Sequence, residues 1–519
     1  MKDLKATVPY GVVFLTSMGV MILELVASRL VSKYLGNSLY TWTSVIGIVL
    51  GGISLGNALG GKLADRFPPE RIVAPLLLAA SLLTFLILIL DLLVARIAQS
   101  SGFQGFPLGL LVRAILLITV LFFLPACALG TISPVMAKYA LSQQTWVGRT
   151  VGGIYAFGSL GSILGTFLTG YLLIPLLGLS AIVLLVGILL ALLAFLFEGV
   201  RVLSGGWAIL LLALLICGAP RGWEQRTVSA PGETRRSLEA KDSAYSYIRV
   251  EDVERGGSRE RILRLDALIH NRYDPLHPDI LLYDYEKIFA SLTRQVAEAV
   301  LGGQDFVTLT IGGGAFLFPA YLERHYPFSR HEVVEIDVEV IRTAFRYFDL
   351  PQNTRLGIFA MDGRAYVDRA LGGGRYDFIY MDAFNSFSIP QQLTTREFAA
   401  KVFSLLGPRG VYLANCIDVL DEGGFLNAYL NTLRSVFPHV AVYKTPRSGP
   451  GQRATYILAG SRIPLAGETL SDEAGSAVAE RLPEADLERL RARKGDVVLT
   501  DDYAPVENLI APVFLRSVR

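Results

Sequence analysis

The chain has 519 residues, of which 52% are hydrophobic and only 18% are charged. This composition is too apolar for one soluble protein and fits a membrane part fused to a soluble part. A net charge of +2 provides no strong field, so the chain is not expected to bind nucleic acid. The three cysteines and five histidines are scattered, and we therefore predict neither a disulfide framework nor a bound metal.

Residues 1–220 contain apolar stretches long enough to cross a bilayer, which takes ~20 residues. We predict an N-terminal all-α transmembrane bundle with spans at 9–31, 39–61, 72–97, 108–136, 150–177 and 178–198. The first span is expected to be a retained helix, because Glu24 and Arg29 interrupt it and no small-residue cleavage site follows. A seventh candidate at 205–219 has a short apolar centre, so the number of spans stays open between six and seven.

The number of spans decides on which side of the membrane the C-terminal part lies. Basic residues gather in two short loops, one with Lys62, Arg66 and Arg71 and the other with Lys138 and Arg149. The positive-inside rule places both loops in the cytoplasm. Six spans then leave the rest of the chain cytoplasmic, whereas seven would put it outside. We expect a multi-pass protein of the cell membrane with a cytoplasmic catalytic domain.

Glycines recur at four-residue spacing within two of the predicted spans. Gly52, Gly56 and Gly60 lie on one face of the second span, and Gly161 and Gly165 on one face of the fifth. Small residues at this spacing let helix backbones approach closely. The pattern predicts that these two helices can bring backbones into close contact, most simply as ordinary helix packing.

A glycine run follows an apolar strand predicted at 305–311. Gly312, Gly313 and Gly314 close that strand, and a second strand at 332–337 carries Glu335, 23 residues after Gly312. The glycines let the backbone approach a ligand, and Glu335 is placed to accept hydrogen bonds from ribose hydroxyls. Leu317 stands where the dinucleotide fingerprint has Gly or Ala. The pattern therefore favours a single nucleoside over NAD.

Strand and helix patterns then alternate along the chain. A third strand at 356–360 precedes Asp362 and Gly363, and a fourth at 376–381 precedes Asp382. Ligands bind beyond the carboxyl ends of parallel strands, so we expect these residues, the glycines and Glu335 at one rim. Each acid alone has an alternative interpretation as a helix cap or turn former. Their occurrence at four successive strand ends favours a site.

Upstream of this α/β region the pattern indicates hairpin strands at 245–250 and 261–265, followed by a helix at 283–301. We predict a linker and small β-rich subdomain over 221–285. An α/β domain with a C-terminal tail is expected to occupy 286–519.

These motifs together resemble the polyamine aminopropyltransferases, the spermidine synthase family, over residues 240–460. The resemblance is carried by Leu265–Asp266, Tyr285, Gly312–Gly314, Glu335–Asp337, Asp362–Gly363 and Tyr376–Asp382. Further segments resemble the membrane-fused branch of that family, namely Glu24–Arg29, Leu63–Arg66, Ser388–Pro390, Leu393–Phe398 and Leu499–Glu507. The resemblance implies a Rossmann-like fold of the class I methyltransferase type.

The resemblance also implies an activity. The donor would be decarboxylated S-adenosylmethionine, used as a co-substrate without any prosthetic group. The acceptor would be putrescine or a similar amine, and methylthioadenosine would leave. Asp382 would be the catalytic base, Glu335 would hold the ribose, and Asp362 with Gly363 would hold the adenine end. The glycines would lie at the sulfonium end, and Tyr285 would line the pocket. A homodimer is also implied.

The chain departs from the family pattern on the acceptor side. Ala315 follows the glycines where the family usually has an amine-binding acid, and Asn385 stands three residues after Asp382 where a second one is usual. Asn385 is kept as a candidate substrate-binding residue at that position. The segment 445–451 lacks the family's pocket tyrosine. Asp418 is a candidate replacement carboxylate for the amine, although it also fits a turn former.

Three hypotheses remain open from the sequence. The first is an aminopropyltransferase acting on a polyamine. The second is an S-adenosylmethionine-dependent methyltransferase, whose donor keeps the carboxylate that the aminopropyl donor lacks. The third is a transporter or scaffold with a sensing domain, suggested by Glu24 and Asp91 in or near the spans, although structural ion pairs are an equal explanation.

Overall fold

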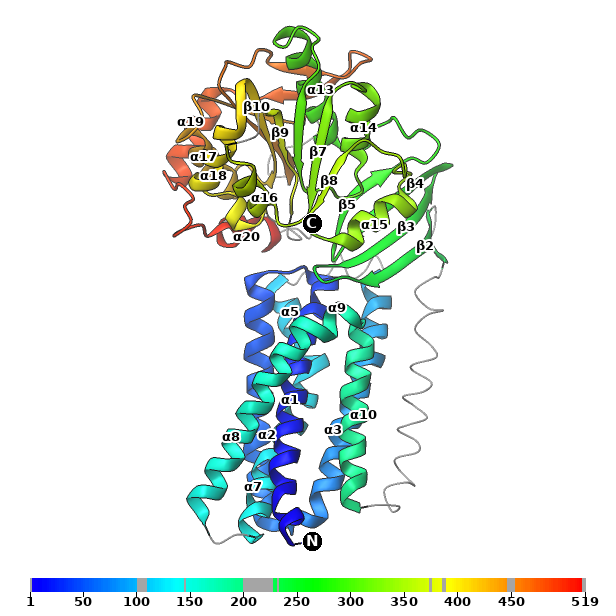
Figure 1. The fold of residues 1–519 in the computed structure, drawn as a ribbon, viewed down its shortest axis with the longest axis vertical. Helices are drawn as coiled ribbons and strands as arrows, with labels where there is room; N and C mark the ends of the chain where they lie inside the picture. Colours follow the sequence, from blue (N-terminus) through cyan, green and yellow to red (C-terminus); the bar gives the residue numbers. More distant parts are fainter. Residues whose placement is uncertain are drawn as a thin grey trace. The chain divides into compact units, whose positions relative to one another are not determined.

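A computed structural model describes residues 2–99, 110–143, 146–198, 227–230, 233–372, 376–384, 389–445 and 453–515. The chain divides into two compact units (Figure 1). One comprises residues 1–226 with 241–247, and the other comprises 227–240 with 248–517. The boundary predicted between residues 285 and 286 falls inside helix α13 (Asp284–Ala299).

The N-terminal unit is helical. Its elements are α1 (Lys2–Leu35), α2 (Leu39–Arg66), α3 (Pro69–Gln99), α5 (Leu110–Ile118), α6 (Leu124–Gly130), α7 (Ile132–Gln143), α8 (Val147–Leu168), α9 (Ile174–Leu176) and α10 (Leu179–Glu198), with π-helical turns at Thr119–Phe123 and Thr169–Leu173. Among the described residues, six helical stretches are long and apolar enough to cross a membrane: Thr7–Leu35, Leu39–Arg66, Pro69–Val94, Val112–Gln143, Val147–Leu176 and Leu179–Phe197. They coincide with the six stretches predicted from the sequence. The seventh candidate, 205–219, lies outside the described residues.

The spaced glycines pack against the backbones of neighbouring helices. A Cβ atom on Gly56 would lie 2.1 Å from the carbonyl oxygen of Cys127 in α6, and one on Gly161 would lie 2.1 Å from that of Phe14 in α1. Side chains at these positions would force the helices apart, because closely packed backbones have no room for them. The predicted close helix pairs are thus present, α2 with α6 and α8 with α1.

Polar groups in this unit also have local partners. The Tyr34 hydroxyl of α1 donates a 2.7 Å hydrogen bond to Asp91 Oδ1 of α3.

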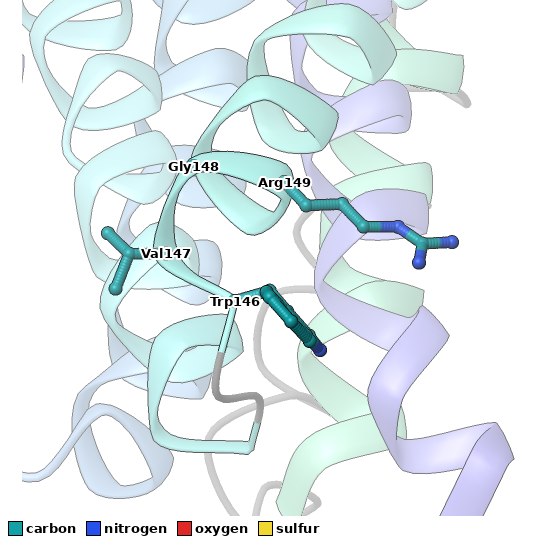
Figure 2. Close-up of a pocket in the computed structure, with 4 residues that line it drawn as sticks. All are labelled: Trp146, Val147, Gly148 and Arg149. Carbon is teal, nitrogen blue, oxygen red and sulfur yellow. The ribbon is translucent and has the colours of Figure 1, made fainter.

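At the start of α8 a surface hollow is lined by Trp146, Val147, Gly148 and Arg149 (Figure 2). The side chains of Trp146 and Arg149 point to the same side of the helix, away from Val147. Trp and Arg are residue types found where spans meet the membrane surface.

The second unit contains a large mixed sheet. Its strands in the described residues are β6 (Val307–Ile311), β7 (Arg330–Glu335), β8 (Gly357–Ala360), β9 (Tyr376–Met381), β10 (Leu406–Asp418), β11 (His439–Lys444), β12 (Ala454–Ser461), β13 (Thr469–Ser471) and β14 (Ala477–Arg481). Their spatial order is β13-β14-β11-β12-β10-β9-β6-β7-β8. The stretch from β10 to β8 is parallel, whereas β12, β11, β14 and β13 pair antiparallel.

The strand order reverses between β6 and β9. From β6 the chain moves outward through β7 and β8, then returns to place β9 on the other side of β6. Such a switch point opens a crevice at the carboxyl ends of the two central strands. The fold is therefore the Rossmann-like, class I methyltransferase-like architecture predicted from the sequence.

Helices cover both faces of the sheet (Figure 1). On one face lie α13, α14 (Leu317–His325) and α15 (Val338–Tyr347), whose apolar residues share a core with Phe378, Tyr380, Val411 and Val333 of the strands. On the other lie α16 (Gly363–Ala370), α17 (Arg396–Leu405) and α18 (Phe425–Arg434). The C-terminal part adds a 3-10 turn (Gln391–Leu393), α19 (Glu484–Lys494) and α20 (Val506–Leu515).

A separate antiparallel sheet precedes α13. In the described residues its strands run in the order β1-β2-β3-β4-β5. They are β1 (Thr227–Ala230), β2 (Glu233–Asp242), β3 (Tyr247–Arg255), β4 (Ser258–Leu265) and β5 (Leu268–Tyr273). The hairpin β4–β5 turns at Asp266, whose φ of 50° is tolerated by Asp better than by most side chains. This sheet is the small β-rich element expected before the α/β core.

Candidate functional site

The four predicted strand ends lie side by side at one rim, because hydrogen bonds continue past the strands. Gly312 N donates to Val334 O at 2.8 Å, Asp382 N to Ile311 O at 2.9 Å, and Met361 N to Glu335 O at 3.1 Å. The glycine loop, Glu335, Asp362 and Asp382 therefore lie together at one rim of the sheet by the switch point, as the strand pattern predicted.

The glycine loop has no space for side chains. Gly312 has a φ of 93°, which favours glycine, and a Cβ there would lie 2.5 Å from the backbone oxygen of Asp382. Gly314, with a φ of 49°, lies equally close to Asn271, since a Cβ would be 2.5 Å from Asn271 Oδ1. A Cβ on Gly313 would meet the ring of Phe316 at 2.6 Å. Gly312 thus brings the backbone against Asp382, Gly314 brings it against Asn271, and Gly313 packs on Phe316.

Glu335 is held by backbone amides. Its Oε2 accepts from Gly313 N at 2.9 Å and Gly314 N at 3.3 Å, and its Oε1 accepts from Asp337 N at 3.0 Å. Burial raises the pKa of this carboxyl, whereas the amide hydrogen bonds favour its ionised form. A carboxylate has about four acceptor positions, so the three amides leave capacity for a ribose hydroxyl.

Asp382 ends β9 directly beside the glycine loop. Part of the residue is exposed at the rim, but protein surrounds the carboxyl group densely. Desolvation raises its pKa to about 7, although hydrogen bonds from Asn415 and Tyr285 favour the ionised form. Asn415 Nδ2 donates to Asp382 Oδ1 at 2.9 Å. A carboxyl group that titrates near neutrality and touches solvent is suited to accept a proton from a bound ligand.

The first turn of α13 contributes two further groups. Tyr285 donates its hydroxyl to Asp382 and is itself nearly buried, with its ring against Tyr283 and Phe289. Glu286 is fully buried, and desolvation, followed by the charge of Asp382, raises its pKa to about 8. Both acids thus have raised pKa values, and the Tyr285 hydroxyl favours the ionised form of each.

Asn271 of β5 connects this turn to the glycine loop. Its Oδ1 accepts from Ala315 N at 2.8 Å, and its Nδ2 donates to Glu286 Oε1 at 3.3 Å. The antiparallel sheet therefore contributes to the site through one side chain.

Asp362 and Gly363 form the start of α16 at the same rim. Asp362 Oδ1 accepts from Ala365 N at 2.9 Å and so caps the helix, while the residue remains partly exposed. Gly363 is buried, and a Cβ on it would lie 2.6 Å from Cγ2 of Ile311. The helix thereby begins close to β6, with the Asp362 carboxylate at the edge of the crevice.

The remaining predicted residues are placed differently. Asp418 has no exposed surface, and its oxygens accept from Val419 N and Leu426 N, both at 2.8 Å. Gly423 packs so closely that a Cβ would overlap Asp418 Oδ1 at 1.5 Å. These contacts give Asp418 a structural task at the start of α18, the turn-forming role weighed above. Asn385 and residues 446–451 lie outside the described residues.

Sequence reasoning missed Asn271, Asn415 and Glu286. Asn415 carried a signal, because an amide interrupts the apolar strand from Val411 to Cys416 near its carboxyl end. Glu286 carried none, since an acid in the first turn of a helix is ordinarily explained by the helix dipole. In the described residues no group of three or more His, Cys, Asp and Glu side chains is arranged to hold a metal ion.

Comparison with known proteins matches residues 300–460 to the spermine/spermidine synthase domain. A polyamine aminopropyltransferase from Vibrio vulnificus (strain CMCP6) is 39% identical over 140 residues, which cover 27% of this chain and 46% of that protein. One from Pyrobaculum neutrophilum (strain DSM 2338 / JCM 9278 / NBRC 100436 / V24Sta) is 31% identical over 228 residues, covering 42% of this chain and 73% of that protein.

A methyltransferase also matches part of the chain. The eEF1A lysine and N-terminal methyltransferase of Homo sapiens is 30% identical over 140 residues, which cover 25% of this chain and 20% of that protein. The matched region thus spans less than half of the Vibrio relative and a fifth of the human one.

Proposed function

The chain belongs to the polyamine aminopropyltransferase (spermidine synthase) family, and we propose on that premise that it transfers an aminopropyl group to an amine. The donor is decarboxylated S-adenosylmethionine and the acceptor is putrescine or a related amine. The products are a spermidine-type polyamine and methylthioadenosine.

The observation that carries this proposal is the environment of Asp382. An alkylamine with a pKa near that of Lys, ~10.4, is almost wholly protonated at neutral pH and cannot attack until it loses a proton. Asp382, with a pKa raised to about 7, is ionised in part at neutral pH and lies beside the glycine loop that receives the donor. Tyr285 and Asn415 fix its orientation.

The reaction then balances without any further group. The acceptor nitrogen forms a bond to the carbon beside the sulfonium, and the carbon–sulfur bond breaks. The bonding electrons remain on sulfur, which becomes the neutral thioether of methylthioadenosine. The ammonium proton passes to Asp382 and leaves to solvent when product departs. Holding nitrogen, carbon and sulfur in line supplies much of the acceleration.

The donor end of the site follows from the other rim residues. Glu335 is assigned to the ribose hydroxyls, Asp362 with Gly363 to the adenine end, and the glycine loop to the sulfonium end. The amides of Gly313 and Gly314 hold the Glu335 carboxylate in place, so the ribose meets a preorganised acceptor.

We also propose that the enzyme is a multi-pass protein of the cell membrane with its catalytic unit in the cytoplasm. Six helical stretches of sufficient length and apolarity support the first part. The basic residues near the ends of α2, α3, α7 and α8, which the sequence had placed in loops, support the second. A homodimer remains a proposal that rests on the family.

A methyltransferase is the second candidate, because a human methyltransferase matches part of the chain. The two activities use donors that differ by one carboxylate and leave different products. Purified protein is therefore incubated with each donor, with and without a panel of amines, and the products are identified by mass spectrometry. Amine-dependent methylthioadenosine supports aminopropyl transfer, and S-adenosylhomocysteine supports methyl transfer instead.

A further inference from the structure

The acceptor side of the site lacks an acid next to the glycine loop. Ala315 occupies the position after Gly314, is 1% exposed, and has its amide bound to Asn271. A cationic amine buried in the crevice needs negative charge around it, because an unpaired buried charge is costly. Asp382 supplies one carboxylate. A second negatively charged group is needed to bind the amine while Asp382 accepts the proton that the amine loses.

Glu286 lies where such a group is needed. It is 0% exposed, it interacts electrostatically with Asp382, and the Tyr285 hydroxyl acts on both acids. Its Oε1 accepts from Asn271, which also binds Ala315 N, so one side chain connects Glu286 to the position that lacks the acid. By distance and angle its Oε2 has no hydrogen-bond partner among the described residues, although the Tyr283 backbone and the Tyr285 hydroxyl also act on the carboxyl group and favour its ionised form.

A second buried glutamate in the same unit shows what a structural carboxylate looks like. Glu332 Oε2 accepts from the hydroxyls of Tyr366 and Tyr376, both at 2.6 Å, and Arg330 pairs with its other oxygen. Burial favours the protonated form of both carboxyls, but the partners of Glu332 outweigh it and lower its pKa, whereas the pKa of Glu286 is raised. A buried acceptor atom without a partner costs about 1 to 3 kcal/mol, so the Oε2 atom of Glu286 contributes less to stability than the fully bonded Oε2 of Glu332.

We propose that Glu286 is an acceptor-binding residue whose Oε2 binds the ammonium group of the amine beside Asp382. It would do from the first turn of α13 what an acid at position 315 would do from the glycine loop. The inference rests on the proposed function, because it requires a cationic acceptor. Glu286 loses its own proton to solvent when the cation binds, and Asp382 then receives the reacting proton.

The pH dependence of amine binding follows from the groups that act on Glu286 and Asp382 in the described part of the chain. Asp382 and Tyr285 act on Glu286, the Tyr283 backbone donates to it, and Glu335 acts on Asp382 from β7. A cation bound between the acids favours the ionised form of both. Amine affinity is therefore expected to rise with pH until Glu286 is ionised, and this dependence should disappear when residue 286 cannot titrate.

The test compares Glu286→Gln with two matched substitutions in the full-length protein in detergent. Glu298→Gln changes an exposed acid on the same helix, and Glu332→Gln changes the buried, fully bonded one. KM for putrescine is measured over a range of pH, together with calorimetric binding of methylthioadenosine and of putrescine to the methylthioadenosine complex.

Glu286→Gln is expected to weaken amine binding about 10- to 100-fold, to remove its pH dependence and to leave methylthioadenosine affinity within about twofold. Adding Ala315→Asp to this variant should restore part of the amine affinity, which a purely structural role would not explain. The inference is overturned if amine KM and amine binding both stay within about twofold of wild type. Absence of turnover in wild-type protein would instead contradict the proposed function. In that case the calorimetric comparison of amine affinity between wild type and Glu286→Gln would still test whether Glu286 binds the amine.

Discussion

Replacing Asp382 with Asn should abolish activity and stabilise the fold at neutral and alkaline pH. Asn preserves the size of the side chain and an oxygen that accepts from Asn415 Nδ2 and the Tyr285 hydroxyl. What the substitution removes is a carboxyl group that must ionise in a poorly solvated position. Keeping an ionisable carboxyl group at this position is therefore expected to lower the free energy of unfolding of the wild-type protein wherever Asp382 is ionised.

The magnitude follows from the pKa of Asp382, which burial raises from 3.8 to about 7 in the folded protein. A carboxyl with a raised folded pKa stabilises the fold fully below its unfolded pKa and loses that contribution as pH rises through the folded pKa. A displacement of about 3 units corresponds to at most about 4 kcal/mol, and the partial exposure of the residue reduces this to about 2 to 4 kcal/mol.

Thermal unfolding of the intact protein in detergent measures this difference at about pH 4.5 and about pH 8. At roughly 2 °C per kcal/mol for a domain of this size, the Tm advantage of Asp382→Asn should grow by about 4 to 8 °C between the two conditions. Asp377→Asn, at the opposite end of β9, serves as the matched control. A Tm difference that is the same at both pH values would refute the reasoning.

Three further substitutions test other parts of the account. Tyr285→Phe removes a hydrogen bond that favours the ionised form of Asp382. The acid limb of the kcat–pH profile should therefore move to higher pH by about half a unit to one unit. An acid limb at unchanged pH would contradict this hydrogen bond. Glu335→Gln loses acceptor positions for three backbone amides and the ribose. It should therefore weaken methylthioadenosine binding about 10- to 100-fold in calorimetry, with Glu298→Gln as control. Unaltered binding would show that Glu335 does not bind the donor. Gly56→Leu should sharply reduce folded protein in membranes, measured by size-exclusion chromatography, because the side chain meets the α6 backbone. Gly61→Leu, with open space around it on the same helix, should not; equal yields of the two variants would contradict the packing.

Much of the architecture could be predicted because the relevant signals are local. The six apolar helices follow from length and hydropathy alone, and the strands ending at Gly312, Glu335, Asp362 and Asp382 follow from apolar runs closed by Gly or acids. The rim then follows from the rule that parallel strands present their carboxyl ends together.

Other parts of the site depend on contacts between distant segments. Asn271 belongs to a different sheet from the glycine loop, and no periodicity links the two. Glu286 looks like an ordinary first-turn acid until its burial and its orphaned oxygen are known. For Asp418 the sequence suggested a ligand-binding residue, because an acid at the end of a strand often binds a ligand. In the structure both of its carboxylate oxygens instead accept hydrogen bonds from backbone amides.

The measurement that tests the central claim most directly is amine-dependent release of methylthioadenosine from decarboxylated S-adenosylmethionine, followed by mass spectrometry in wild type and Asp382→Asn. The account predicts methylthioadenosine together with an aminopropylated amine in wild type, and neither in the variant, although the variant still binds methylthioadenosine. Release of S-adenosylhomocysteine from S-adenosylmethionine, or product formation that survives Asp382→Asn, would contradict it.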